Sequence, residues 1–138
     1  MTNSSQTTEV SYVLDTVAIV SHLENRKGFG SEAREVFAAA ERGEARLLIS
    51  PIVVAELFWY FSKREQLDRF RQVYNEMETR PWFRFLDLSA RQASEFMSLE
   101  SVPEMHDRII AGHAHHLSVP LVTNDLQIQA SGSVETVW

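Results

Sequence analysis

The hydrophobic residues follow two different spacings along the chain, and these spacings predict alternating strands and helices. Short apolar runs predict strands at residues 12–14, 46–49, 82–86 and 120–122, with a last strand at 134–137. Apolar residues that recur every three or four positions predict helices at 16–23, 31–42, 51–62, 66–78, 89–99 and 105–117, with a short helix from Leu126. This alternation is typical of an α/β domain with a mostly parallel central sheet of about four or five strands flanked by helices.

The length of the chain fits a single domain. Its 138 residues can form one sizeable core, and there is no internal repeat or long linker that would separate two units. The first residues are polar and lack hydrophobic periodicity. We therefore expect a flexible N-terminal segment over residues 1–10 and the folded domain over residues 11–138.

Composition narrows the class of protein. No apolar run approaches the roughly 18–20 residues that span a bilayer, and the N-terminus lacks the pattern of a secretory signal. There is no cysteine, which excludes disulfides, thiolate metal sites and a cysteine nucleophile. These features favour a cytoplasmic protein with no membrane partner. The net charge of -6 argues against a broadly basic nucleic-acid binder, but it is compatible with a nuclease that keeps a local basic patch beside an acidic site.

Four carboxylates occupy informative positions. Asp15 directly follows one predicted strand, and Asp125 lies just beyond another. In open parallel sheets the ligand site lies outside the carboxyl ends of the strands, so these two acids are expected there. Glu56 lies within an apolar helix, where a carboxylate needs a cationic partner, and Asp107 begins a helix with apolar residues next to it. Such a set can bind one or two hard divalent cations such as Mg²⁺ or Mn²⁺, which prefer oxygen ligands.

Each acid also has a structural interpretation when it is taken alone. The three aspartates can cap helices or turns, because acids are favoured at helix N-termini. Glu56 can form an ion pair with Arg34 or Arg64 in the core. The set as a whole favours a metal site, because all four acids are expected at one edge of one sheet.

The segments that carry these acids resemble, in family order, the motifs of the PIN domain, and within it the VapC-type toxin ribonucleases. The matching segments are Tyr12-Val13-Leu14-Asp15-Thr16, Ser50-Pro51-Ile52-Val53-Val54-Ala55-Glu56-Leu57, His106-Asp107-Arg108-Ile109-Ile110-Ala111-Gly112-His113-Ala114, Pro120-Leu121-Val122-Thr123-Asn124-Asp125 and Val134-Glu135-Thr136-Val137-Trp138. No single motif is specific, whereas the ordered set covers nearly the whole chain.

The resemblance implies a nuclease that depends on Mg²⁺ or Mn²⁺ and hydrolyses phosphodiester bonds of RNA. The residues at the matching positions are the catalytic metal-site acids Asp15, Glu56, Asp107 and Asp125, and the supporting hydroxyls Thr16 and Thr123. The aspartates would bind the metal directly, and Glu56 would bind it through water or position the attacking water. The chain departs from the family pattern at Val17, where relatives often carry Ser or Asn.

Cationic residues near the predicted site are candidates for binding the RNA backbone. They are Arg26, Lys27, Lys63, Arg64 and His106. The structural alternative for the segment that contains Lys63 and Arg64 is a solvated helix face with ion pairs to neighbouring acids.

Two further clusters favour structural interpretations. The histidines at positions 106, 113, 115 and 116 are close in sequence, but no HExxH spacing is present, so a packed or solvated helix is favoured over a zinc site. The aromatic run at 58–61 and the aromatics at 82, 83 and 85 can stack on bases, although such runs are more typical of a core or of a partner surface.

Several functions fit this sequence. The favoured one is an endoribonuclease toxin of a type II toxin–antitoxin system, with a cognate antitoxin as partner and a homodimeric state. The alternatives are a PIN-fold RNA-processing nuclease without an antitoxin and a catalytically inactive PIN-like binding module. A further alternative is an unrelated α/β domain whose acids are caps.

Overall fold

The computed structural model describes residues 9–138, and over this range the strands form one five-stranded sheet in which all neighbours run parallel. The strands are β1 (Val10–Leu14), β2 (Ala45–Ile49), β3 (Phe83–Phe85), β4 (Leu121–Val122) and β5 (Thr136–Val137). Their order across the sheet is β3-β2-β1-β4-β5. The chain therefore builds outward from β1 to β3 and then returns to add β4 on the other side of β1. Strand order reverses between β1 and β4, and this is where ligands bind in open α/β sheets.

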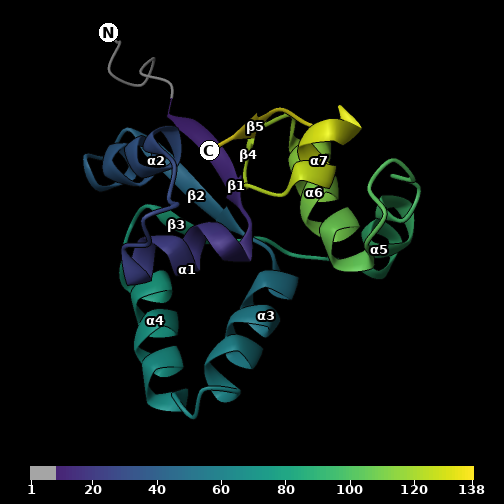
Figure 1. Cartoon of the computed structure of the whole chain (residues 1–138). Coiled ribbons are helices and arrows are strands. Elements are labelled where there is room, and N and C mark those ends of the chain that lie inside the picture. The colour runs from purple at the N-terminus through teal and green to yellow at the C-terminus, as the bar shows by residue number, and fades with distance from the viewer. Residues whose placement is uncertain (1–8) are drawn as a thin grey trace, which may run out of the picture.

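Within residues 9–138, seven helices flank the sheet (Figure 1). They are α1 (Thr16–Glu24), α2 (Ser31–Glu41), α3 (Pro51–Ser62), α4 (Leu67–Thr79), α5 (Ala90–Phe96), α6 (Met105–Leu117) and α7 (Leu126–Ser131). This arrangement confirms the predicted α/β class with a parallel central sheet. No helix in the described range is long and apolar enough to cross a membrane.

Local sequence signals explain where the helices begin. The Ser50 hydroxyl accepts a hydrogen bond from the Ile52 backbone N–H at 3.3 Å, and Pro51 occupies the first turn, so α3 starts where the sequence predicts. Ser89 and Gln92 form a reciprocal capping box at the start of α5. Helix α5 ends at Phe96, three residues earlier than the 89–99 prediction, because the chain turns at Met97 and Ser98.

The core lies on both sides of the central strands, and the strands contribute aliphatic residues with no exposed surface. Val13, Leu14, Leu47, Ile49 and Leu121 are all 0% exposed. Buried strands of this kind are near-continuous hydrophobic runs, which is why the short apolar segments predict them. The sheet can therefore act as a rigid base for the residues that follow its strands.

The end of the described chain packs against the start of α2. The Trp138 carbonyl oxygen accepts hydrogen bonds from the backbone N–H groups of Glu32 and Ala33, at 3.2 and 3.3 Å. Gly30, the N-cap of α2, has no side chain for this task, and a Cβ there would lie 2.3 Å from the Trp138 backbone. Trp138 thus replaces the missing cap and fixes β5 beside α2.

The N-terminal boundary falls inside the segment expected to precede the domain. Residues 1–8 lie outside the described range, but Val10 already pairs with Ala45 in the sheet, and Glu9 forms an ion pair with Arg46 at 2.8 Å. The first strand is therefore longer at its start than the apolar run at 12–14.

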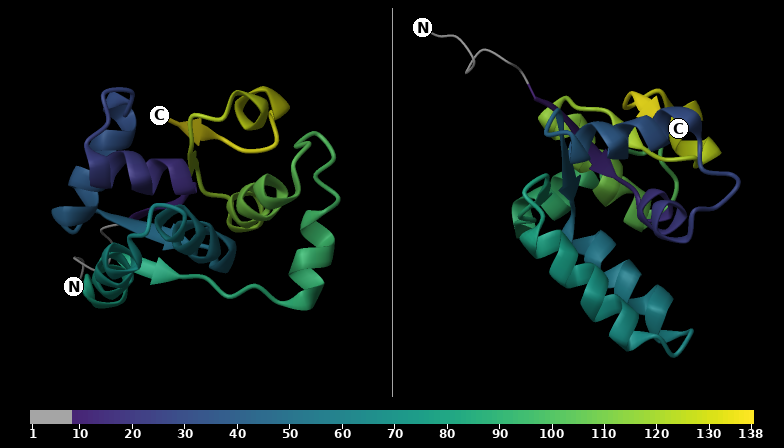
Figure 2. Two further views of the ribbon diagram at one scale, coloured as in Figure 1. Left: turned by 60° about the horizontal axis from the view of Figure 1, so that its bottom comes forward. Right: turned by 90° about the vertical axis from the view of Figure 1, so that its left-hand side faces the viewer.

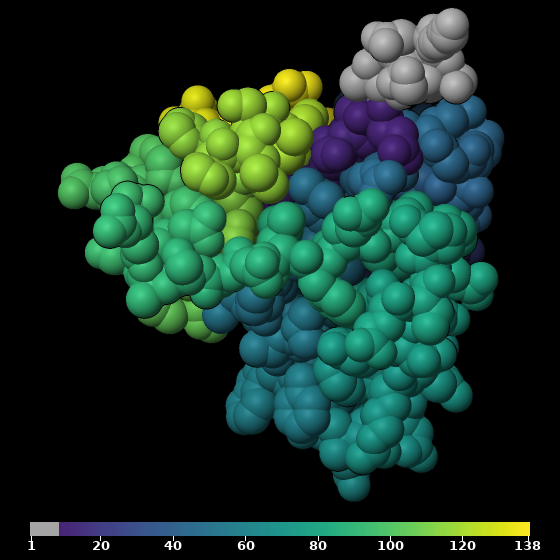
Figure 3. Space-filling model, turned by 180° about the vertical axis from the view of Figure 1, so that it is seen from behind, coloured from purple at the N-terminus to yellow at the C-terminus, as the bar shows by residue number. Residues whose placement is uncertain are grey.

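Helices α3 and α4 form a hairpin that extends away from the sheet, as Figure 1 and the right-hand view of Figure 2 show. From behind, the same hairpin forms a lobe below the rest of the molecule (Figure 3). Helix α3 also contacts α1 and α6 near the sheet. One end of α3 is therefore anchored beside the carboxyl edge of the sheet, and its other end projects into solvent.

Candidate active site

The four predicted acids come from four different elements and meet at the carboxyl edge of the sheet. Asp15 follows β1, and Asp125 follows β4 after two intervening residues. Glu56 lies in the second turn of α3, the helix that follows β2, and Asp107 lies in the first turn of α6. The strand order reverses between β1 and β4, so the acids surround the expected ligand position of this fold.

Asp15 is the most enclosed of the four. Its side chain accepts a hydrogen bond from the Thr16 backbone N–H and another from the Thr123 hydroxyl, both at 2.7 Å. Burial raises the pKa of Asp15 to about 6 against the lowering effect of these two bonds, and the nearby charges of Glu56 and Asp125 raise it further. Asp15 therefore caps α1, and its surroundings disfavour the ionised form of its carboxyl group.

Thr123 connects the first and last acids. Its hydroxyl is completely buried, donates to Asp15 Oδ2 and accepts from the Asp125 backbone N–H at 3.0 Å. Asp125 Oδ1 in turn accepts from the backbone N–H groups of Gln127 and Ile128, at 2.9 and 3.0 Å, and so caps α7. One hydroxyl thus sets the relative position of two carboxylates.

Glu56 is held by a hydroxyl and an imidazole. Its Oε1 accepts a hydrogen bond from the Thr16 hydroxyl at 2.5 Å, and its Oε2 lies 3.0 Å from His106 Nδ1. The alternative of a core ion pair with Arg34 or Arg64 is wrong, because both arginines bond elsewhere. The guanidinium of Arg34 binds the loop at 25–29, and that of Arg64 donates to the Tyr60 carbonyl oxygen.

The pKa of Asp107 reflects both its burial and the negative charge of the surrounding acids. It is half-buried, and burial is the largest cause that raises its pKa to about 7, followed by the charges of Asp15 and Asp125 and then of Glu104 and Glu56. The other three acids of the predicted set are thus near enough to disfavour ionisation of Asp107. No hydrogen bond to its side chain offsets this effect within the described residues.

The donor set fits a hard divalent cation in its chemistry. All four groups are carboxylates, the ligands that Mg²⁺ and Mn²⁺ prefer, and their mutual repulsion is relieved by a bound cation. The side chains do not stand in a ready-made coordination shell: within residues 9–138, no three His, Asp or Glu groups are arranged to hold a metal. The carboxylates of Asp15 and Glu56 bond instead to Thr123, Thr16 and His106.

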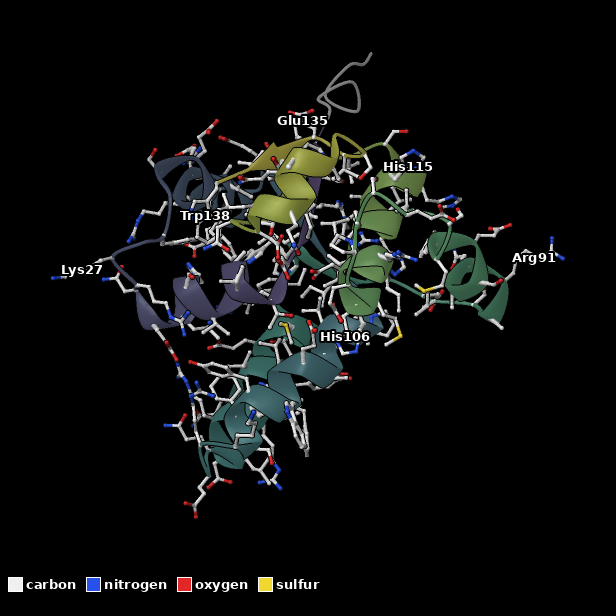
Figure 4. The ribbon with its side chains drawn as sticks, turned by 45° about the vertical axis from the view of Figure 1, so that its right-hand side comes forward. Lys27, Arg91, His106, His115, Glu135 and Trp138 are labelled. Carbon is white, nitrogen blue, oxygen red and sulfur yellow. The ribbon has the colours of Figure 1, made fainter. Side chains whose placement is uncertain are left out.

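A cleft of about 880 Å³ opens beside the acids, between α1 and α3. Such a volume falls in the range of about 300–1,000 Å³ that is typical of ligand pockets. Asp15, Glu56 and His106 line one part of it, and Figure 4 shows His106 at the end of α6 next to α3. The remaining lining residues are Thr16, Val17, Val20, Arg26, Ile52, Ala55, Trp59, Tyr60, Lys63 and Arg64.

Four of the five cationic candidates line this cleft. They are Arg26, Lys63, Arg64 and His106. Lys27 is exposed, does not line the cleft and points outward from the loop after α1 (Figure 4). Val17, which departs from the family pattern, adds an apolar side chain to the wall of the cleft rather than a polar one.

Tyr60 organises the basic end of the cleft, a role that the sequence analysis missed. The Arg64 guanidinium lies 3.6 Å from the centroid of its ring, and Arg26 Nη2 donates to its hydroxyl at 2.9 Å. The Tyr60 hydroxyl donates to Glu24 Oε2 at 2.5 Å. The spacing of four residues that separates Glu56 from Tyr60 and Tyr60 from Arg64 was the available signal, because it places Glu56 and Tyr60 on one face of α3 and Arg64 just past the end of that face.

The other histidines of the α6 region are not part of this site. His113 is buried against Phe96, with ring centroids 5.1 Å apart, and its Nε2 has no hydrogen-bond partner among the described residues. His115 and His116 are exposed. The arrangement agrees with the packed and solvated helix favoured from the sequence.

Comparison with known proteins gives a family match and several structural neighbours. The family model described as PIN domain matches residues 12–131. The structure is similar to VapBC2 from Rickettsia felis bound to a promoter DNA fragment, with a TM-score of 0.71 and 20% identity over 93% of this chain and 98% of that chain. It is also similar to FitAcB from Neisseria gonorrhoeae, with a TM-score of 0.68 and 20% identity over 92% of this chain and 96% of that chain.

A third neighbour is the DNA-bound VapBC from Salmonella typhimurium, with a TM-score of 0.68 and 19% identity over 93% of this chain and 97% of that chain. At these identities the solved structures establish a common fold. The comparison with curated proteins found no match.

Proposed function

The chain belongs to the PIN-domain family, and we propose that it is a metal-dependent endoribonuclease whose catalytic residues are Asp15, Glu56, Asp107 and Asp125. The observation that carries this proposal is the convergence of the four acids at the strand-order reversal, where burial, and then the charges of the neighbouring acids, raise the pKa values of Asp15 and Asp107. Helix capping alone accounts for Asp15 and Asp125, but it gives no reason for their closeness to Glu56 and Asp107.

The proposed cofactor is Mg²⁺ or Mn²⁺, which the three aspartates would hold directly. Glu56 would bind the cation through a water molecule or would position the attacking water. Such a cation, when bound, lowers the pKa of a coordinated water and neutralises charge that develops on the phosphate. Thr123 and Thr16 fix the orientation of Asp15 and Glu56. His106 fixes the second oxygen of Glu56 and leaves its imidazole at the edge of the cleft, within reach of a bound phosphate.

The substrate in this proposal is RNA, with its backbone along the cleft. Arg26, Lys63 and Arg64 supply positive charge at the end away from the acids, which offsets locally the net charge of -6. Lys27, which lies outside the cleft, has at most a peripheral role in this arrangement.

We further propose that the protein is the toxin of a type II toxin–antitoxin system, with a cognate antitoxin and a second copy of the chain as partners. Support comes from the solved neighbours, whose names describe VapBC and FitAcB. A toxin that cuts cellular RNA would act in the cytoplasm.

The test is cleavage of a mixed cellular RNA pool by the purified protein with added Mg²⁺ or Mn²⁺, compared with Asp15→Asn. We expect cutting that requires metal and that Asp15→Asn abolishes while it remains folded. A folded wild-type protein that binds Mn²⁺ but cuts no RNA in the pool would favour the inactive binding module. A protein that binds no divalent cation would contradict the metal site itself. A nuclease with no antitoxin gene beside its own would favour the RNA-processing alternative.

A further inference from the structure

One face of α3 changes its chemical character along its length. Two adjacent rows of side chains, each with a spacing of four residues, line the cleft and end in the turn that follows the helix. The first row is Ile52, Glu56, Tyr60 and Arg64, and the second is Ala55, Trp59 and Lys63. Each row begins with an apolar residue, continues with an aromatic residue and ends with a cation. In the first row the carboxylate of Glu56 lies between the apolar and the aromatic residue.

Trp59 is unusually exposed for its residue type. Its side chain is 62% exposed, whereas Trp82 and Trp138 are each partly buried. Within residues 9–138 its ring packs against no other aromatic ring, and the Lys63 ammonium lies 5.6 Å from the ring centroid. A large exposed aromatic surface in a cleft, with a cation over the ring, fits a ligand that is both planar and anionic.

Phe58 provides a contrast on the same helix. It is 44% exposed, but it lies outside the cleft, and its ring packs edge-on against Phe70 at a centroid distance of 5.3 Å. The Phe58 ring thus has an aromatic partner within the α3–α4 hairpin, unlike the ring of Trp59. Trp59 instead lines the same cleft as Asp15 and Glu56.

The helix geometry places these groups at intervals that suit a nucleic-acid strand. The rise of about 1.5 Å per residue puts Trp59 about 4.5 Å along the helix axis from Glu56, and Lys63, the C-cap of α3, roughly 10 Å from it; Arg64 follows in the turn just past the helix. A strand with a phosphate at the acids would then place a neighbouring base over Trp59. Its phosphates about two or three nucleotides further on would reach Lys63 and Arg64.

We propose that Trp59 is a positioning residue on which a base of single-stranded RNA stacks, next to the phosphate that is cut. The inference rests on the proposed nuclease function and deepens it. A duplex cannot use this platform, because its bases are stacked on one another and paired. Stacking tolerates every base but is strongest for purines, so adenine-rich strands bind more tightly than uridine-rich strands.

The experiment compares Trp59→Ala, Trp59→Phe and the matched control Phe58→Ala in RNA cleavage. We expect Trp59→Ala to raise KM about tenfold with little change in kcat, because base–aromatic stacking contributes that order of affinity. Trp59→Phe retains a stacking surface and should restore most of the loss, and Phe58→Ala should match the wild type. Helix content and Tm of each variant establish that the fold is intact.

A second measurement follows binding without cleavage. In the Asp15→Asn background, the indole fluorescence is titrated with short oligo(A), oligo(U) and a duplex of the two. Quenching by oligo(A) that exceeds quenching by oligo(U) and is absent with the duplex supports stacking. The additional Trp59→Phe change should remove this quenching while a labelled oligo(A) still binds.

The outcomes separate the inference from the function on which it rests. A wild-type protein that cuts RNA, with an unchanged KM in Trp59→Ala, overturns the inference and leaves the nuclease intact. A wild type that cuts no RNA in any pool overturns the proposed function, and absent quenching would then overturn the stacking as well. Loss of affinity for a protein partner in Trp59→Ala, with RNA binding unchanged, would identify Trp59 as a protein-docking residue and overturn the inference.

Discussion

The two ends of the cleft between α1 and α3 are built in opposite ways. At the acidic end, Asp15 and Thr123 are buried and bonded to each other, and Glu56 is held at both of its oxygens. At the other end, Lys63 and Arg64 are exposed in the turn that follows the projecting end of α3. Bond cleavage requires atoms fixed to a fraction of an ångström, whereas attraction of phosphates requires only charge. The rigid edge of the sheet holds the atoms needed for cleavage in place, and the solvent-exposed end of the helix is sufficient to attract phosphates.

The same difference predicts unequal effects of mutation. Substitutions at the acidic end should abolish or strongly reduce catalysis with smaller effects on RNA binding. Substitutions at the basic end should weaken binding and leave the chemical step in place.

The largest expected effect comes from Asp107→Asn. It removes one carboxylate of the proposed metal site, so we expect cleavage to fall by more than the ~10- to 100-fold that is typical when a supporting group is removed. The matched control is Asp68→Asn, which changes an exposed aspartate in the first turn of α4. If both variants retain full activity, Asp107 serves only as an acid in the first turn of α6, where the helix dipole favours it.

Thr123→Val should have the next largest effect. It removes the hydroxyl that donates to Asp15 Oδ2 and leaves the Asp125 backbone N–H without its acceptor. We expect cleavage to fall about 10- to 100-fold, with a stability loss of about 1–3 kcal/mol from the unsatisfied group. Cleavage assays and urea denaturation measure the two effects. Thr79→Val in α4, where the hydroxyl bonds only to the Asn75 carbonyl oxygen, should change neither by a comparable amount.

The acidic end should also make the metal-free protein sensitive to pH. The pKa values of Asp15 and Asp107 are raised in the folded state to about 6 and about 7, from 3.8. Their contribution to folding is therefore fully present below about pH 4 and is lost as pH rises through 6 and 7. Urea denaturation in EDTA should show that Asp107→Asn is more stable than the wild type at pH 8, with a smaller difference at pH 5.

Added Mg²⁺ should reverse this order at pH 8, because a cation that binds only the folded protein stabilises it by an amount that grows with its affinity. A wild-type protein that is more stable than Asp107→Asn at pH 8 without metal would contradict the account of repulsion among the acids.

The smallest effect is expected at the basic end. The double variant Lys63→Gln, Arg64→Gln should weaken RNA binding several-fold with little change in kcat at saturation. Removing one cation that binds a phosphate should reduce the slope of log binding constant against log salt by about 0.7 for a single strand. Arg71→Gln, which lies outside the cleft and is paired with Asp68, and Lys27→Gln are the controls. Equal weakening of binding in the controls would indicate that net charge, not the cleft, governs binding.

Much of the fold follows from local sequence signals. The prediction for α3 is correct at both ends, because Ser50 and Pro51 define its start by their own chemistry. The ends of α5 and of the edge strands differ by up to a few residues from the predictions. Such boundaries depend on pairing and packing that hydrophobic spacing does not report.

The site was less predictable from the sequence than the fold. Asp15, Glu56, Asp107 and Asp125 were identifiable from their positions relative to strands and helices and from the family motifs. The partner of Glu56 was not, because Thr16 is 40 residues away and His106 is 50 residues away. Arg34 and Arg64 were plausible partners by charge, yet they bond to the loop and to Tyr60.

The alternation of strands and helices, the family and the four carboxylates can thus be recognised in the sequence, because periodicity, capping and motif order are properties of neighbouring residues. The reversal of strand order between β1 and β4, and the connection of Asp15 to Asp125 through Thr123, appear only in the folded chain. The same holds for the cleft that Asp15 and Glu56 share with Trp59, Lys63 and Arg64. These facts depend on contacts between residues far apart in the chain, and the packing of α1, α3 and α6 around the sheet fixes them.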